Sequence, residues 1–263
     1  MYNKPPREQA RHYDIQWYRQ TGVFHPEQLS SETPTVGVSA NTWREYINLI
    51  RQAAADNPAH RFISPELMTT ADMELAEIPD QHAVVNDRLA ELQELSTSMP
   101  AAELVVGTPE YQPHSTYNSL MIITNGIRYV LERKRTIFSS AERGTFTASN
   151  TLQQRYTRTL SAVCADLVGY GMQYPQYPKL PQDTRAIHAS CCWATPREEG
   201  ARYAAAPDEE RYTSAMTHTL GHLFTHYPQL QQIMVVDRTP SSTAIPPLNC
   251  VAQRNAHNGI IES

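Results

Sequence analysis

Alternating apolar and polar positions predict a series of strands and helices from residue 35 onward. The β-branched run at residues 35–40 predicts a strand, and residues 42–56 carry apolar side chains at spacings of three and four, as one helix face requires. Residues 61–64 predict a second short strand, which stops at a proline. Strand, helix and strand in this order form the building block of an α/β sheet.

The same kinds of pattern continue to about residue 240. Asn125 and Gly126 predict a tight hairpin turn between two strand-like runs, because both residues tolerate the positive φ that such a turn needs. Helices are expected at two further places, residues 87–98 and 208–227. Further strands are expected at residues 103–107, 117–124, 127–133, 155–164, 185–190 and 232–237.

The two ends of the chain lack this periodicity. Residues 1–33 are polar and are expected to be an N-terminal extension with a short helix over residues 13–19. Residues 241–263 are expected to be a short C-terminal tail. One domain is therefore predicted over residues 34–240.

Composition and charge exclude several classes of protein. The chain has 263 residues and a formal net charge of −5 without a long basic run, which argues against a nucleic-acid binder. No apolar run approaches the roughly 20 residues that span a bilayer, and the first residues lack the apolar stretch of a signal peptide. Four cysteines do not make a disulfide framework in a chain of this length. We therefore expect a cytoplasmic protein without nucleic-acid or membrane partners.

Three reactive side chains follow predicted strands. Glu66 comes after residues 61–64, Lys134 after the return strand of the hairpin, and Cys164 after a short apolar run. Lys134 is informative because only 3 of the 22 basic residues are lysines. The carboxyl ends of strands are where catalytic groups of α/β proteins collect. A thiol nucleophile, a carboxylate that moves protons and an ammonium that stabilises an oxyanion together predict acyl-transfer chemistry.

The motifs around these residues resemble those of the nitrilase, or carbon–nitrogen hydrolase, superfamily. The resemblance spans roughly residues 35–240, in the family's order and in the expected strand contexts. It rests on Ser64-Pro65-Glu66-Leu67, Glu132-Arg133-Lys134-Arg135, Ala141-Glu142-Arg143 and Val163-Cys164-Ala165-Asp166. The resemblance implies an α/β fold, the family's four-layer α-β-β-α sandwich.

The resemblance also implies an activity and a catalytic triad. Glu66, Lys134 and Cys164 would hydrolyse a non-peptide carbon–nitrogen bond, that of a small carboxamide, through a cysteine acyl-enzyme. The substrate would be a small-molecule amide or nitrile, no metal or organic cofactor would be needed, and the protein would be a homodimer through its outer helical face.

Four further residues would support the triad. The backbone N–H of Ala165 would be a second donor to the oxyanion. Glu142 would orient Lys134 or the substrate nitrogen. Asp166 and Trp193 would line the pocket.

Simpler interpretations and other functions stay open at this point. Glu66 could cap the turn that follows it, Lys134 could be a solvated strand end, and Cys164 could be a small buried hydrophobic residue. An inactive nitrilase-like binding protein and an acyltransferase of the same superfamily are the alternative functions.

A zinc site is the remaining alternative. His218, His222 and His226 follow one helix face at intervals of four, a spacing at which histidines can bind zinc. A tetrahedral site on one straight helix would need a further ligand from elsewhere, so a polar helix face is the simpler interpretation.

Overall fold

The structure is a computed structural model of the chain. The described residues are 13–29, 33–58, 60–137, 140–151, 158–175, 177–192, 208–238 and 247–255.

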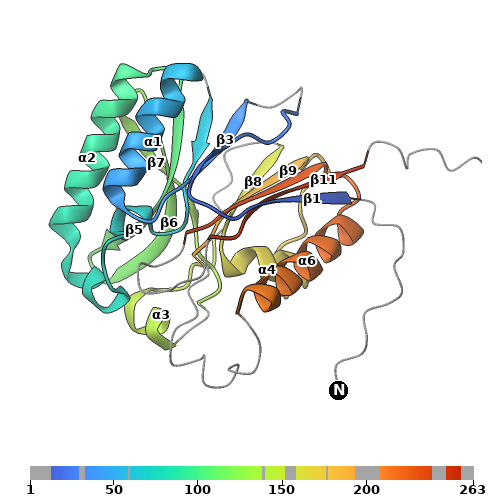
Figure 1. Ribbon diagram of the computed structural model, residues 1–263. Coiled ribbons are helices and arrows are strands. Elements are labelled where there is room, and N and C mark those ends of the chain that lie inside the picture. The colour runs from blue at the N-terminus through green and yellow to red at the C-terminus, as the bar shows by residue number, and fades with distance from the viewer. Residues whose placement is uncertain are drawn as a thin grey trace, which may run out of the picture.

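Two β-sheets lie face to face and form the centre of the molecule (Figure 1). The larger sheet has the order β2 (Gly22–Phe24), β3 (Thr35–Ser39), β4 (Arg61–Ile63), β5 (Glu103–Gln112), β6 (Ser115–Thr124) and β7 (Ile127–Arg133). The smaller sheet has the order β1 (Tyr13–Tyr18), β11 (Asn249–Arg254), β10 (Gln232–Val236), β9 (Ala186–Ser190) and β8 (Thr159–Val163).

Helices cover the outer face of each sheet (Figure 1). The larger sheet is covered by α1 (Trp43–Asp56) and α2 (His82–Ser98), and the smaller one by α4 (Ala165–Gly171) and α6 (Asp208–His226). The short helix α3 (Ser140–Thr145) lies at one end of these layers (Figure 1), and the 3₁₀ turns Met68–Thr70 and Leu75–Asp80 connect β4 to α2. The layer order is α-β-β-α, so the predicted fold class is confirmed.

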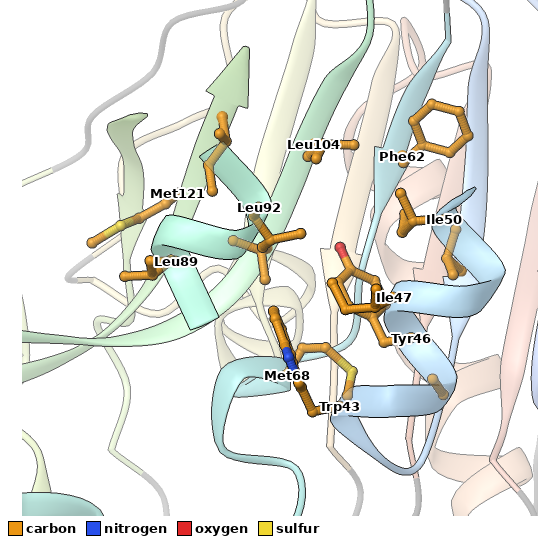
Figure 2. Packing of buried hydrophobic residues seen from close by; sticks show 14 of the residues in the cluster. Trp43, Tyr46, Ile47, Ile50, Phe62, Met68, Leu89, Leu92, Leu104 and Met121 are labelled. Atoms are coloured by element: carbon orange, nitrogen blue, oxygen red, sulfur yellow. The ribbon is translucent and has the colours of Figure 1, made fainter. Parts of the chain in front are cut away.

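The outer core of the larger sheet is built by the periodicity of α1. Tyr46, Ile47 and Ile50 recur at helical spacing and are buried against Phe62 of β4 and Leu104 of β5, as Figure 2 shows. The side chain of Thr42 accepts a hydrogen bond from the N–H of Glu45 at 3.2 Å and caps the first turn of the helix. This apolar stripe fixes the face of the helix that meets the sheet.

A second core fills the space between the two sheets. Its side chains come from both inner faces, and they are Phe24, Ile63, Val105, Leu120, Ile122, Leu131, Val163, Met234, Val236 and Val251. Parallel pairing joins β3 to β4 and β4 to β5 in one sheet, and β8 to β9 and β9 to β10 in the other. The segments that follow β4, β8, β9 and β10 hydrogen-bond to one another across the two sheets, and the candidate site lies among these segments.

The predicted extension and tail need correction, because both ends of the chain contribute strands. β1 pairs antiparallel with β11, with Tyr13 opposite Arg254, and β2 pairs with β3. Residues 13–18 are therefore a strand and not the expected helix, and the fold extends beyond the predicted limits of 34 and 240. The physical reason is a period of two in β1, in which Tyr13, Ile15 and Trp17 pack against the α6 side while the residues between them are exposed.

One internal strand is longer than predicted. β5 runs through Pro109 to Gln112, whereas a break was expected near that proline. Proline lacks an N–H to donate to a strand partner. β4 ends at Ile63, opposite Val105, so Pro109 has no β4 residue beside it.

No helix among the described residues has both the length and the apolar character needed to cross a bilayer.

Candidate active site

Glu66 lies in the turn after β4, with its backbone held by the opposite sheet. Its N–H donates to the carbonyl of Cys191 at 3.2 Å, and its own carbonyl accepts from Nε of Arg238 at 2.9 Å. Leu67, the next residue, has a left-handed φ of 53°. Glu66 itself is buried, so these contacts fix the direction in which its carboxylate points.

Gly107 of β5 allows this turn to approach the sheet. A Cβ atom at Gly107 would lie 2.4 Å from the carbonyl oxygen of Pro65 and 2.8 Å from Cα of Glu66. Its N–H donates to Oγ of Ser64 at 2.9 Å. Only glycine fits such a close approach of two backbones, so Gly107 helps to fix the position of Glu66.

Lys134 follows β7 and reaches Glu66 inside the molecule. Its N–H donates to the carbonyl of Asn118 at 2.8 Å, which extends the hairpin by one residue. Its Nζ donates to Oε1 of Glu66 at 2.8 Å and also to the carboxylate of Glu142 from α3. Burial alone would lower the pKa of Lys134, but the charges of Glu66 and Glu142 hold that pKa well above its usual value. The side chain is therefore an ammonium ion.

Asn118 contributes to the site, although the sequence analysis assigned it no role. It is fully buried on β6, and its Nδ2 donates to Oε1 of Glu66 at 2.6 Å. Together with its backbone bond to Lys134, this contact joins the two charged residues through one strand. The signal in the sequence that could have indicated a role is a polar amide shortly before the apolar residues 120–123 of a predicted strand.

Cys164 lies at a sharp turn between β8 and α4. Its φ of 44° and ψ of −105° are unusual for a residue with a side chain, and its N–H donates to the carbonyl of Ser190 at 2.8 Å. Strain of this kind is typical of functional sites. Ala165 begins α4, and the first N–H groups of a helix have no partner within the helix. The Ala165 N–H is therefore a suitable oxyanion donor.

The surroundings of Cys164 keep it protonated at rest. A hydrogen bond with the Cys191 thiol, burial and the charge of Glu66 raise the pKa of Cys164 well above its usual value, and Lys134 opposes them only in part. Both charged residues thus act on the thiol, which brings the three expected triad members into one electrostatic environment. A thiol in this state needs a general base before it can attack.

Asp166 lies one residue further along α4 and binds the chain around Lys134. Its carboxylate accepts from the N–H of Arg135 at 3.0 Å, the N–H of Thr136 at 2.9 Å and the hydroxyl of Tyr177 at 2.5 Å. Burial raises its pKa to about 6, although these hydrogen bonds oppose the rise. Asp166 therefore links the segment after Lys134 to the turn at Cys164.

Of the two remaining expected site residues, the structure describes Glu142 but not Trp193. Glu142 lies on α3, and its ion pair with Lys134 places a second carboxylate on the same ammonium. Trp193 lies outside the described residues.

The histidines of α6 form a surface row and not a closed site. The Nε2 atoms of His218 and His222 lie 3.1 Å apart, and Nδ1 of His222 lies 3.4 Å from Nε2 of His226. Burial and the two neighbouring rings lower the pKa of His222. Within the described ranges, no group of three or more His, Cys, Asp or Glu side chains is arranged to hold a metal ion.

Comparison with known proteins gives a match in structure but none in sequence. No family model and no curated protein matches the chain. Solved structures of one amidase match over most of this chain. A cysteine-to-alanine mutant of the amidase from Nesterenkonia sp. AN1, in complex with butyramide, has 9% identity and a TM-score of 0.55, covering 93% of this chain and 91% of that one.

Two further structures of that amidase agree with this match. A cysteine-to-alanine mutant, described as an amidase from the nitrilase superfamily, has 10% identity and a TM-score of 0.55, with 88% of this chain and 92% of that chain covered. A glutamate-to-glutamine mutant carries the acetamide moiety of fluoroacetamide on its active-site cysteine, with 10% identity, a TM-score of 0.51, and coverage of 97% and 93%. The chain therefore has the fold of nitrilase-superfamily amidases.

Proposed function

We propose that this protein is a thiol-dependent hydrolase of small carboxamides that works through a cysteine acyl-enzyme. The observation that carries the proposal is the buried ion pair of Lys134 with Glu66, with both charges acting on the thiol of Cys164. A buried cation between two carboxylates is costly to maintain for stability alone, which favours a chemical role. The fold shared with amidases supports the same reaction class.

In the first step, Glu66 acts as general base for Cys164. The raised pKa of the thiol means that the proton leaves only as the sulfur attacks the amide carbonyl carbon. The oxyanion that forms accepts hydrogen bonds from Nζ of Lys134 and from the N–H of Ala165. Glu66 then donates the proton to the departing nitrogen, which leaves a thioester on Cys164 and releases ammonia or an amine.

In the second step, the same carboxylate activates water. Glu66 takes a proton from the water molecule as it attacks the thioester, and returns it to the sulfur when the acid leaves. Lys134 stabilises the second oxyanion as it did the first. Glu142 keeps the ammonium directed toward the reacting carbon, and Asp166 holds the backbone beyond it. Every step uses side chains of this chain, and none calls for a metal or an organic cofactor.

Ammonia release from a panel of small amides and nitriles tests the activity. The wild-type protein is expected to turn over at least one short-chain amide, and Cys164→Ala is expected to reduce turnover to background. Cys250→Ala is the matched control, because Cys250 is a buried cysteine on β11 and not part of the site. Equal turnover by wild type and Cys164→Ala would exclude the thiol mechanism.

Mass spectrometry of the intact protein tests the covalent intermediate. Glu66→Gln keeps the shape of the side chain but cannot activate water, so a reactive ester or hydroxamate is expected to leave a stable acyl adduct. Cys164→Ala should carry none. Transfer of the acyl group to an added amine in preference to water would instead indicate the acyltransferase alternative.

The proposal includes the setting and the assembly. We assign a cytoplasmic, reducing compartment, which agrees with four free cysteines in the described structure. We also assign a homodimer through the outer helical face. Light scattering after size-exclusion chromatography measures the mass in solution, and a monomeric mass at micromolar concentration would contradict this assignment.

A further inference from the structure

Cys191 lies beside Cys164 because of the register of two parallel strands. β8 and β9 pair with Val163 opposite Ser190, so Cys164 and Cys191 are the next residues along each chain. Neighbouring strands lie about 4.8 Å apart. Disulfide-bonded cysteines have Cα atoms about 4.4–6.8 Å apart. The register alone therefore brings these two residues within bridging range.

Hydrogen bonds hold both backbones, and Cys164 packs against the hydrophobic cluster that contains Cys191. The N–H of Cys164 donates to Ser190 and the N–H of Cys191 donates to Val236, each at 2.8 Å. The two side chains share a hydrogen bond. Cys191 is fully buried whereas Cys164 is only half-buried, so a small reagent from solvent meets Cys164 first.

We propose that Cys164 and Cys191 are an oxidant-sensitive pair that closes to a disulfide when Cys164 reacts with hydrogen peroxide. The sulfur of Cys164 attacks one peroxide oxygen, the O–O bond breaks, and a sulfenic acid and water form. The sulfur of Cys191 then attacks the sulfenic sulfur, forming the S–S bond and releasing the second oxygen as water. Two thiols lose two electrons, and one hydrogen peroxide molecule becomes two water molecules.

The surroundings set the speed and the outcome of this reaction. Glu66 is the base that takes the proton of Cys164, so the first step is slow compared with that of a preformed thiolate. The second step is intramolecular, because the register of β8 and β9 places Cys191 beside the sulfur that it attacks. A sulfenic acid here is therefore captured as a disulfide before it is oxidised irreversibly to the sulfinic acid.

The disulfide would stop the proposed amidase reversibly, and this part of the inference rests on the proposed function. A sulfur in a disulfide cannot attack an amide carbonyl carbon, and reduction by a thiol restores it. The cross-link itself requires only the two cysteines. Its detection therefore does not depend on whether the protein hydrolyses any amide.

Peptide mapping of the full-length protein tests the cross-link. Trypsin releases Cys164 in residues 159–179 and Cys191 in residues 186–197. After treatment with hydrogen peroxide, we expect these peptides joined, with fragmentation assigning the bond to Cys191, and separated again by dithiothreitol. Wild-type protein in which Cys164 proceeds to the sulfinic acid without the joined peptide would overturn the proposal, as would a bond to Cys192.

Two matched variants sharpen the test. Cys191→Ser keeps the shape of the side chain but cannot resolve the sulfenic acid, so peroxide should convert Cys164 to the sulfinic acid, which dithiothreitol does not reverse. Cys192→Ser, changed at the adjacent position, should form the joined peptide as the wild type does. Equal rates of sulfinic acid formation at Cys164 in the wild type and Cys191→Ser would contradict a resolving role for Cys191.

Activity measurements separate the two hypotheses. If the amidase proposal holds, dithiothreitol should restore ammonia release in the oxidised wild type but not in oxidised Cys191→Ser. A joined peptide in a protein without amidase activity would leave the cysteine pair standing and overturn only the proposed function.

Discussion

Two adjacent cations at the end of the hairpin form ion pairs of different kinds. Arg133 binds Glu110 with two parallel bonds, from Nη2 at 2.5 Å and Nε at 2.7 Å, and 22% of its side chain is exposed. Lys134 binds Glu66 with a single bond at 2.8 Å, and only 2% of its side chain is exposed. Two consecutive residues thus form a bidentate ion pair near the surface and a single-bond ion pair in the interior.

The ion pair of Arg133 and Glu110 is held by further contacts on both side chains. Glu110 also accepts bonds from Ser119 and Gln112, each at 2.9 Å, and the guanidinium lies 4.6 Å from the ring centre of Tyr117. Burial would raise the pKa of Glu110, but these hydrogen bonds hold it below its usual value. Glu110 therefore stays ionised, and the ion pair keeps both its charges and its geometry, as a structural clamp should.

The Lys134 pair has the opposite character. An ammonium is a compact charge on a flexible stem and can redirect its donors, whereas a guanidinium has a fixed fork. Nζ of Lys134 contacts two carboxylates through single bonds and lies in the electrostatic field of a thiol. Two neighbouring cations with similar partners can therefore serve stability in one case and chemistry in the other.

The largest expected effect comes from removing the interior cation. Lys134→Met should lower kcat for amide hydrolysis about 10²–10³-fold, because the oxyanion loses a charged donor. Ammonia release measures this loss, and Lys179→Met, which changes an exposed lysine, is the control. Circular dichroism at the assay temperature checks that the variant is folded, since the carboxylates of Glu66 and Glu142 both lose their partner. A folded Lys134→Met variant with the kcat of the wild type would contradict a chemical role for the Lys134–Glu66 pair.

Removing the surface cation should affect stability more than rate. Arg133→Met leaves Glu110 buried without its bidentate partner, which should lower the free energy of unfolding by about 3 kcal/mol at neutral pH. Because the pKa of Glu110 is lowered by folding, its contribution is present above its ordinary value of 4.5 and disappears as the pH falls below it. Urea unfolding at several pH values measures both. A loss of kcat as large as that of Lys134→Met would show that the two pairs act as one.

Asp166 provides a carboxylate with the reverse pH dependence. Its pKa is raised by folding from 3.8 to about 6, so the folded protein holds this proton more tightly than the unfolded chain does. The stability that this group contributes is complete below pH 4 and disappears as the pH rises through about 6. Relative to Asp166→Asn, the wild type should lose about 2–3 kcal/mol between pH 4 and 7. Parallel stability profiles for the two proteins would contradict the raised pKa.

The smallest expected effect concerns Asn118, whose side-chain amide links Glu66 to β6. Asn118→Ala removes the donor to Oε1 of Glu66 and should lower kcat about tenfold, a typical cost of about 1.4 kcal/mol for one charge-assisted bond. KM should change little, because Asn118 acts through Glu66. Asn48→Ala on the exposed face of α1 is the control. A change confined to KM would instead place Asn118 in contact with the substrate.

Local signals were sufficient for much of the fold. The stripe of α1 predicted its buried face, and the hairpin turn has the expected positive φ angles, 46° at Asn125 and 75° at Gly126. The positions of Glu66, Lys134 and Cys164 at strand ends followed from the same patterns. Each of these features is specified by residues close together in sequence, which is why a single sequence carries them.

Features that depend on distant partners were missed. β1 has only three alternating apolar residues, and its strand partner comes from the other end of the chain. The length of β5 depends on where β4 ends, and the contact between Cys164 and Cys191 depends on the register of β8 and β9. The sequence supplies the residues in each case, but the pairing is a property of the assembled sheets.

The pairing of β1 with β11 has a consequence for synthesis on the ribosome. Tyr13 meets Arg254, a partner that is translated 241 residues later. At about 5–20 residues per second, β1 must wait roughly 10–50 s before its hydrogen-bonding edge can be covered. Ile15 and Trp17 lack α6 until residue 226 has been translated, and they lack the partner strand until the end of that interval. The nascent chain therefore exposes the apolar residues and the unpaired edge of β1 through almost the whole of translation. We expect a chaperone to bind this segment.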